Sequence, residues 1–399
     1  MTSPISVSEI QGPLPKQQGR PAHWVTDQGN AFRNPWQSWR EHDWRDILQI
    51  LFQFTKERPS IPENIQTLIP VRKPTWNHEG EDAQKLKATW LGHASFFVEL
   101  PARAAAEDAE RIPGRGPRIL FDPIFSKRCS PVKLPGFDRY TPPACVVEDL
   151  PEIDAVVISH NHYDHFDGPT ISKLASLPRT PHFFAPLGNI SLLKSYGVPQ
   201  SHCHALDWWD SRRVEVQIPL KKDTSKSVSA LFDITCTPAQ HAVGRTLMDR
   251  LFHPRTLWSS WVAREVLPES SSASAKSLYF AGDTGYRAVL EPEDEDKAPV
   301  CEAFKQVGER MGPVDLALIP IGAYLPRRFM SPVHCSPRDA AFLFKDLGAK
   351  NAIAMHWGTF ILTTEPIMEP PKKLKEALEE LGISKDSFIC TDIGETKLY

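Results

Sequence analysis

Four candidate metal ligands lie within six residues of one segment, Ser159-His160-Asn161-His162-Tyr163-Asp164-His165. An apolar, β-branched run at 155–158 precedes it and is typical of a buried strand, so we expect the segment in the loop where that strand ends. Residues two apart in an extended chain share a face, so His160 and His162 can bind one ion together. The chain must then turn for Asp164 and His165 to reach a second ion. Zinc favours imidazole nitrogen and carboxylate oxygen, so this loop predicts a zinc centre.

An ordinary loop of surface polar residues is the alternative interpretation of this segment. The chain holds 14 histidines in 399 residues, so three within six positions are improbable by chance. Further ligands are expected at the ends of other predicted strands: His241 follows 234–237, Asp283 follows 277–280, and His356 follows 352–354. A single His or Asp at the end of a strand is more often structural than functional. The order of these three residues along the chain favours a functional role.

Composition argues against several classes of protein. Hydrophobic residues make up 41% and charged residues 24%, as in ordinary soluble globular proteins. A net charge of −3 argues against nucleic acid as a partner. The seven cysteines are scattered without paired spacing, which indicates a reducing, intracellular compartment. No apolar run approaches the roughly 20 residues that span a bilayer, and no secretory signal is expected.

The chain is predicted to have three parts. Residues 1–30 are polar and rich in Pro, Gln and Gly, and we predict a mobile tail. Residues 31–85 form an aromatic and helical segment. A helix predicted over 44–54 packs either on the main domain or on a membrane surface. Residues 86–399 carry the strand-and-turn pattern of the main domain.

Short strands outnumber helices in the main domain. Surface insertions are predicted at 102–117 and 269–276. Helices are predicted at 337–347 and 371–381, and strands at 89–91, 95–100, 118–121, 155–159, 182–184, 234–237, 277–280, 316–320 and 352–356. This pattern favours a layered α/β fold in which sheets pack together and helices cover the outside.

The order of the candidate ligands resembles the metallo-β-lactamase superfamily: a His-x-His-x-Asp-His run, a separate His, a strand-ending Asp and a C-terminal His. The resemblance implies an αββα sandwich with two zinc ions per chain at one edge of the sheets. One ion would be held by His160, His162 and His241. The other would be held by Asp164, His165 and His356. Asp283 would bridge the two ions together with a hydroxide.

Longer strings narrow the resemblance to the N-acylphosphatidylethanolamine-hydrolysing phospholipase D family. They lie at 34–36, 91–95, 121–125, 206–209, 282–286, 320–324 and 356–360. The family implies hydrolysis of N-acylphosphatidylethanolamine to an N-acylethanolamine and a phosphatidic acid, with the bridging hydroxide attacking phosphorus. The two insertions and the pair Arg327-Arg328 depart from the family pattern and put the exact lipid in doubt.

Further residues are predicted to act around the metals. Asp164, Asp283 and His334 are the catalytic candidates. His334 either hydrogen-bonds the substrate when neutral or protonates the leaving group when charged. The alternative is that it supports the metal ligands from outside or caps the helix at 337. His93 and Asp122 are expected to orient ligands. The substrate-binding candidates, with burial in the core as their alternative, are Trp208, Trp209 and Tyr324, together with His334.

The sequence leaves other functions open. A zinc hydrolase of the same fold could act on a lactone or on another phosphodiester, and a catalytically silent scaffold could keep the fold as a binding surface. The expected partners are a phospholipid and a membrane surface bound peripherally, without nucleic acid. A homodimer is left open. The expected location is intracellular, either cytoplasmic or peripheral to a membrane, in an organelle that the sequence does not name.

Overall fold

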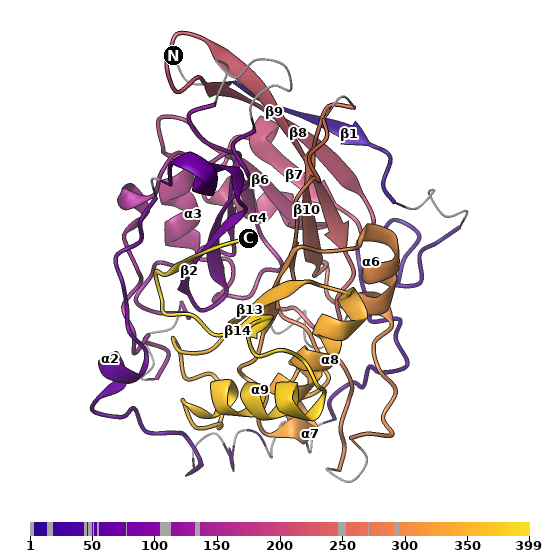
Figure 1. Cartoon of the computed structure of the whole chain (residues 1–399). Helices are drawn as coiled ribbons and strands as arrows, with labels where there is room; N and C mark the ends of the chain where they lie inside the picture. The colour runs from indigo at the N-terminus through magenta and orange to yellow at the C-terminus, as the bar shows by residue number, and fades with distance from the viewer. Residues whose placement is uncertain are drawn as a thin grey trace.

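Two β-sheets face each other in the middle of the molecule and helices lie on the outside (Figure 1). This arrangement confirms the αββα sandwich expected from the sequence. The computed structural model describes residues 4–13, 19–43, 46, 50, 52–53, 56–76, 78–103, 113–131, 136–245, 253–269, 271–291 and 295–399.

The larger sheet has eight strands in the order β1-β8-β9-β10-β11-β12-β13-β14. The strands from β11 to β14 pair in parallel, and the other pairs are antiparallel. Their bounds are β1 Ile5–Ile10, β8 Ser211–Pro219, β9 Ser227–Thr237, β10 Ser260–Val266, β11 Ser277–Phe280, β12 Leu316–Pro320, β13 Asn351–Met355 and β14 Phe388–Ile389.

The smaller sheet has seven strands in the order β15-β2-β3-β4-β5-β6-β7. The strands from β4 to β7 pair in parallel, and the rest are antiparallel. Their bounds are β15 Thr396–Leu398, β2 Lys87–Gly92, β3 Ser95–Glu99, β4 Arg118–Phe121, β5 Ala155–Val157, β6 His182–Pro186 and β7 Cys203–Leu206.

Helices cover the outer faces of both sheets. α3 (Gly168–Ala175) and α4 (Ile190–Ser195) pack on the smaller sheet, whereas α6 (Ala303–Met311), α8 (Pro337–Leu347) and α9 (Glu369–Glu380) pack with the larger one. α8 matches its predicted bounds. Ser336 and Asp339 form a capping box at its start, and Gly348 ends it in a left-handed conformation with φ 60°. The short elements are α2 (Ile65–Leu68), α7 (Arg327–Met330) and 3₁₀ turns at Gly80–Gln84, Val147–Asp149 and Gln200–His202.

The core forms because strand residues alternate between the two faces of the smaller sheet. In β3, Phe96 and Val98 point between the sheets, whereas Phe97 packs beneath the helices on the other face. Contacts across the sandwich fix the spacing of the sheets. The rings of Phe121 and Phe280 are 4.8 Å apart, and Trp261 Nε1 donates to the carbonyl of Ile158 at 3.0 Å.

The N-terminal part differs from the predicted mobile tail. Residues 5–10 form β1, which pairs with the edge strand β8, because that edge offers unpaired backbone groups and Ile5 and Val7 pack on the core. Trp24 Nε1 also donates to Asp207 at 2.8 Å. Most of the predicted helix at 44–54 and most of the insertion at 102–117 lie outside the described residues. The insertion at 269–276 joins β10 to β11 and is described apart from residue 270.

Candidate metal centre

The candidate ligands follow strands that end at the same edge of the sandwich. The loop 160–165 follows β5 of the smaller sheet. His241, Asp283 and His356 follow β9, β11 and β13 of the larger sheet. Strands that run in the same direction bring their carboxyl ends to one edge, and side chains beyond those ends therefore converge on one site.

The first group of side chains consists of His160, His162, His241 and Asp283. His162 Nδ1 lies 2.9 Å from His160 Nε2 and 3.4 Å from His241 Nε2. Asp283 Oδ2 lies 3.8 Å from His160 Nε2 and 3.9 Å from His241 Nε2. One ligand atom from each residue lies within 4.8 Å of the others, so the group could hold a metal ion.

The second group consists of His93, Asp164, His165 and His356. Asp164 Oδ2 lies 3.5 Å from His165 Nε2 and 3.6 Å from His356 Nε2. Asp283 reaches this group as well, because its Oδ2 lies 3.1 Å from His165 Nε2 and its Oδ1 lies 3.1 Å from His356 Nε2. Asp283 therefore faces both groups, as a bridging ligand must.

The residues of both groups fit a metal ion chemically. His165 Nε2, His356 Nε2 and Asp283 Oδ1 are buried in the centre, and although each lies 3.1 Å from a facing carboxylate or imidazole atom, none makes a well-aligned hydrogen bond within the described residues. Unpaired buried polar atoms cost free energy, and a cation coordinated by them removes that cost. Imidazoles and carboxylates in this ratio are a donor set that zinc accepts.

Burial keeps two of the ligand rings, His160 and His162, neutral. It lowers the pKa of His162 to about 3 and holds the pKa of His160 well below its usual 6.5, so both rings are neutral, the form that binds metal. Burial also opposes the charge on Asp164 and Asp283. The neighbouring His165 outweighs it and keeps both carboxyl pKa values well below their usual range.

Hydrogen bonds to neighbouring groups orient the ligand rings. Asp122 Oδ2 accepts from His165 Nδ1 at 2.6 Å, and its other oxygen accepts from the backbone N–H of Ser159 at 2.7 Å. The carbonyl of Val333 accepts from His241 Nδ1 at 2.8 Å. His93 Nε2 lies 3.0 Å from Asp164 Oδ2. The structure thus places His93 and Asp122 where residues that orient ligands would lie. The structure also places Ser159 among the residues that contact Asp122, and the sequence marks Ser159 only by its position directly before His160.

Strained backbone is concentrated at this centre. His93, Asp122 and His356 have φ values of 52°, 37° and 61°, conformations that cost on the order of 1–3 kcal/mol each and that cluster at functional sites. Gly282, with φ 58°, immediately precedes Asp283. A Cβ on Gly282 would lie 2.5 Å from the Cβ of Ser159, so the turn that presents Asp283 needs glycine.

His334 lies beside the shared carboxylate. Its Nε2 is 3.8 Å from Asp283 Oδ2, and its ring centroid is 5.2 Å from that of His356. Burial holds the pKa of His334 well below 6.5, so the ring is neutral near pH 7. The side chain of Ser336 caps α8, so the capping alternative for His334 does not apply.

The aromatic residues predicted to line a lipid cavity make other contacts. Trp208 stacks on His23 at 4.2 Å and donates from Nε1 to the carbonyl of Trp258, so the core alternative fits it. The guanidinium of Arg310 lies 4.8 Å from the ring of Trp209. The hydroxyl of Tyr324 donates to Glu369. These contacts hold the three residues by packing and hydrogen bonds that do not involve the candidate ligands.

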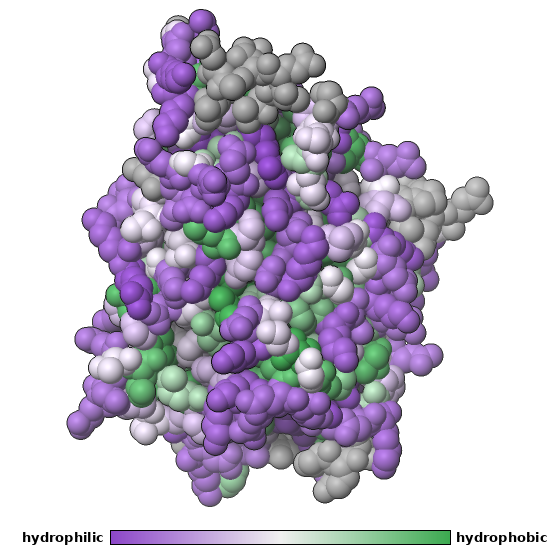
Figure 2. All heavy atoms as spheres, in the orientation of Figure 1, coloured by the Kyte–Doolittle hydropathy of each residue, from purple (hydrophilic) through white to green (hydrophobic). Residues whose placement is uncertain are grey.

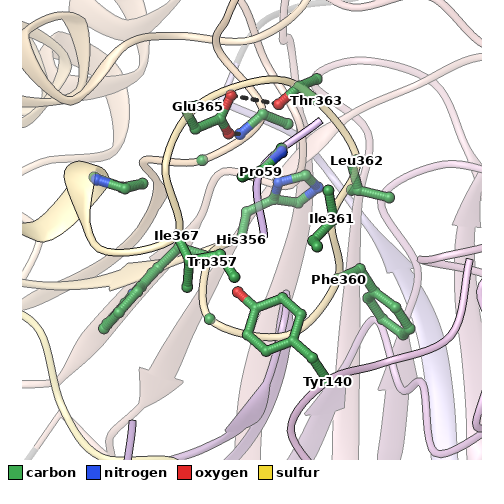
Figure 3. A pocket seen from close by; sticks show the side chains of 14 residues that line it. Pro59, Tyr140, His356, Trp357, Phe360, Ile361, Leu362, Thr363, Glu365 and Ile367 are labelled. Carbon is green, nitrogen blue, oxygen red and sulfur yellow. Dashed lines mark hydrogen bonds between the residues drawn. The ribbon is translucent and has the colours of Figure 1, made fainter. Parts of the chain in front are cut away.

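A pocket opens beside His356, as Figure 3 shows. The hydroxyl of Tyr140 and the apolar chains of Ile361 and Ile367 face it. Glu365 lies at its rim and accepts hydrogen bonds from Thr363 and from the backbone N–H of Ala323. Pro59 completes the wall from the N-terminal segment. The lining mixes apolar chains with polar groups, and the space of about 30 Å³ has room for only one or two water molecules in this structure.

Comparisons with known proteins agree with this geometry. Residues 117–357 match the model of the beta-lactamase superfamily domain. The chain is 33% identical over 379 residues to N-acyl-phosphatidylethanolamine-hydrolyzing phospholipase D 1 of Caenorhabditis elegans, and the match covers 92% of each protein. It is 29% identical to the mitochondrial N-acyl-phosphatidylethanolamine-hydrolyzing phospholipase D of Saccharomyces cerevisiae, over 92% of this chain and 75% of that protein. A possible metal-dependent hydrolase from Veillonella parvula has a similar fold, with a TM-score of 0.51 at 15% identity, over 79% of this chain and 100% of that one.

Proposed function

Because the chain belongs to the beta-lactamase superfamily, and within it to the family of N-acylphosphatidylethanolamine-hydrolysing phospholipases D, we propose that it is a zinc-dependent phosphodiesterase acting on N-acylphosphatidylethanolamine. Its products would be an N-acylethanolamine and a phosphatidic acid. Membership of the superfamily makes the chain a metal-dependent hydrolase, and the choice of lipid rests on the two phospholipases. The observation that carries the proposal is Asp283, whose carboxylate faces both groups of candidate ligands.

In this proposal each group of side chains would hold one zinc ion. His160, His162 and His241 would hold the first. Asp164, His165 and His356 would hold the second, and Asp283, which faces both groups, would be shared between them. When bound, the two ions lower the pKa of a water molecule towards 7 and polarise the phosphoryl oxygens of the substrate.

His334 acts on the substrate in its neutral form in this proposal. Because burial disfavours the imidazolium, the ring contributes a hydrogen bond to a phosphoryl oxygen rather than a proton to the leaving alcohol. His93 and Asp122 hold Asp164 and His165 in place through their hydrogen bonds.

The proposed substrate lies in a bilayer. Within the described ranges, each helix is too short or too polar to reach across a membrane. We expect docking from the surface at α2, where Ile61 and Leu68 are 49% and 38% exposed and where hydrophobic groups show in Figure 2. Pro59 links this side to the pocket beside His356. Leu48 and Leu51 belong to the helix predicted over 44–54, for which a membrane surface was one of two expected contacts, and they lie outside the described residues.

The membrane contact can be tested by changing Ile61 and Leu68 together to Glu. Binding to liposomes should fall, whereas hydrolysis of a short-chain, soluble substrate should stay within about twofold of the unchanged protein, because the metal ligands are untouched. Changing Leu290 and Val300 together to Glu places the same two charges at other exposed apolar positions, 42% and 40% exposed, and should leave liposome binding unchanged. Equal binding by all three proteins would remove α2 from the docking surface.

The activity is tested by incubating the purified protein with N-acylphosphatidylethanolamine, phosphatidylcholine, a lactone and an activated phosphodiester. We expect release of N-acylethanolamine that stops with a chelator and resumes with zinc. Hydrolysis of the lactone in preference to the lipid would replace the proposed substrate with another ester. Absence of hydrolysis from a fully metallated protein would favour the silent scaffold.

A further inference from the structure

Arg245 contacts the ligand loop 160–165 from a distant part of the sequence. Its Nε donates to the carbonyl of Asn161 at 2.5 Å, and its Nη2 donates to the carbonyl of Phe166 at 2.6 Å. The carbon of the guanidinium lies 4.1 Å from the centre of the Tyr163 ring and 5.0 Å from that of Phe166. All of these contacts fall on residues that alternate with, or directly follow, the ligands of the loop 160–165.

Two loops are joined by this side chain. Arg245 lies four residues after His241, in the loop that follows β9 of the larger sheet, whereas its hydrogen-bond partners follow β5 of the smaller sheet. His162 and His241 belong to the same candidate metal group, with 3.4 Å between His162 Nδ1 and His241 Nε2. A connection between the two loops therefore fixes the separation of ligands that come from different sheets.

Arg245 can connect the two loops because its guanidinium is planar, and its charge matters less for this role. Both short hydrogen bonds end on backbone carbonyls rather than on a carboxylate, and two nitrogens of a rigid planar group are used at once. Within the loop, His165 and Phe166 both donate from the backbone to the carbonyl of His162, so the segment is a tight turn. The carbonyls of Asn161 and Phe166 are bound from outside the loop by Arg245. A lysine would keep the charge but could not reach both carbonyls with fixed geometry.

We propose that Arg245 is a positioning residue that locks the ligand loop 160–165 against the His241 loop and thereby sets the affinity of the metal centre. The inference rests on the proposed metal site. Groups that orient ligands from outside typically contribute 10–100-fold to metal affinity, and Arg245 acts in this way on the backbone rather than on a ligand ring.

The test is the rate at which the fully metallated protein releases zinc to a chromophoric chelator. Arg245→Lys should release zinc about 10–100-fold faster than the unchanged protein. Tyr163→Ala, which removes the stacked ring, should give a smaller acceleration, and Tyr163→Phe should give none. Arg213→Lys is the matched control, because Arg213 also uses two nitrogens, at 2.8 and 2.9 Å from Asp233, on β8 and β9.

A second measurement separates positioning from general support of the fold. The melting temperatures of the metal-free forms of Arg245→Lys and Arg213→Lys should agree within about 2 °C. Unchanged zinc release from Arg245→Lys would overturn the inference, and so would equal acceleration in Arg213→Lys. If the unchanged protein held no zinc, the proposed function would fail and the inference with it. If it held two zinc ions but cleaved another lipid, only the substrate would fail.

Discussion

At the scale of single residues, Asp283 is the side chain on which the two-metal proposal depends most directly. Asp283→Asn keeps the volume but removes the charge and one good ligand oxygen. Elemental analysis should show a fall from two metals per chain towards one or fewer, and the rate of lipid hydrolysis should fall by roughly 100-fold or more. Asp233→Asn, which breaks a carboxylate pair with Arg213 on β8 and β9, should keep both metals. A fully active Asp283→Asn protein with a complete metal content would contradict the bridging role.

His334 is a second prediction at this scale. Because burial lowers the pKa of His334, we expect a hydrogen-bonding role, and His334→Ala should slow hydrolysis by on the order of 10²–10³-fold while the metal content stays complete. The loss should be similar for the natural lipid and for a nitrophenyl phosphodiester, whose leaving group needs no proton. A far larger loss on the lipid would show that His334 protonates the leaving alcohol after all.

At the scale of residues, the candidate ligands can be predicted from the sequence because residue types and spacings that suit a metal ion can be recognised within short segments. Three histidines within six positions can be recognised without a structure, and so can an Asp or a His at a strand end. Residues that act across loops carry no such signal. Arg245 and the carbonyl of Asn161 are 84 residues apart, and only the packing of the two sheets brings them together.

At the scale of elements, strands were predictable where their own residues are mostly apolar. β4, β11 and β12 have the predicted bounds, since both of their faces are buried. In β8, buried residues alternate with half-exposed polar ones. Because of this half-polar pattern, the strand was not predicted from the sequence. β1 was not predicted, because it lies in a polar segment rich in Pro, Gln and Gly and the edge of β8 supplies its pairing.

An ion cluster across three strands gives a prediction at this scale. Glu99 on β3 stands opposite Lys87 on β2 and Arg118 on β4, and it lies 3.1 Å from Lys87 Nζ and 2.5 Å from Arg118 Nε. Glu99→Gln leaves two buried cations without their carboxylate, so unfolding of the metal-free protein by urea at pH 7 should show a loss of about 3–5 kcal/mol. Arg212→Gln, whose partner Glu9 is exposed, should cost under about 1 kcal/mol.

The pH dependence of the stability difference between the unchanged protein and Glu99→Gln follows from the direction in which the pKa of Glu99 is shifted. Burial raises the pKa of Glu99, but Arg118 and Lys87 outweigh it, so the folded-state pKa lies below the usual value. A lowered carboxyl pKa stabilises the fold above the unfolded pKa of about 4.3, and this stability is lost as the pH falls through the folded value. The gap between the unchanged protein and Glu99→Gln should therefore be complete at pH 7 and narrow below about pH 4. A gap that widened in acid would refute the ion-cluster explanation.

At the scale of the whole molecule, the candidate metal centre joins the two sheets of the sandwich. The loop 160–165 comes from the smaller sheet, and His241, Asp283 and His356 come from the larger one. An ion that binds only when these loops are together binds the folded state and not the unfolded chain, so its binding free energy adds to stability. At a free concentration 1,000 times Kd, one such ion contributes about 4.1 kcal/mol.

Removal of the metals should therefore destabilise the entire domain rather than one loop. We expect a chelator to lower the melting temperature by several degrees, with one cooperative transition, and stoichiometric zinc to restore it. Asp283→Asn should show a smaller chelator-induced shift, since less metal is bound before the chelator is added. Lys372→Gln changes an exposed residue of α9 and should keep the full shift. If the chelator abolished hydrolysis but left the melting temperature of the unchanged protein where it was, the ions would serve the chemistry without joining the sheets.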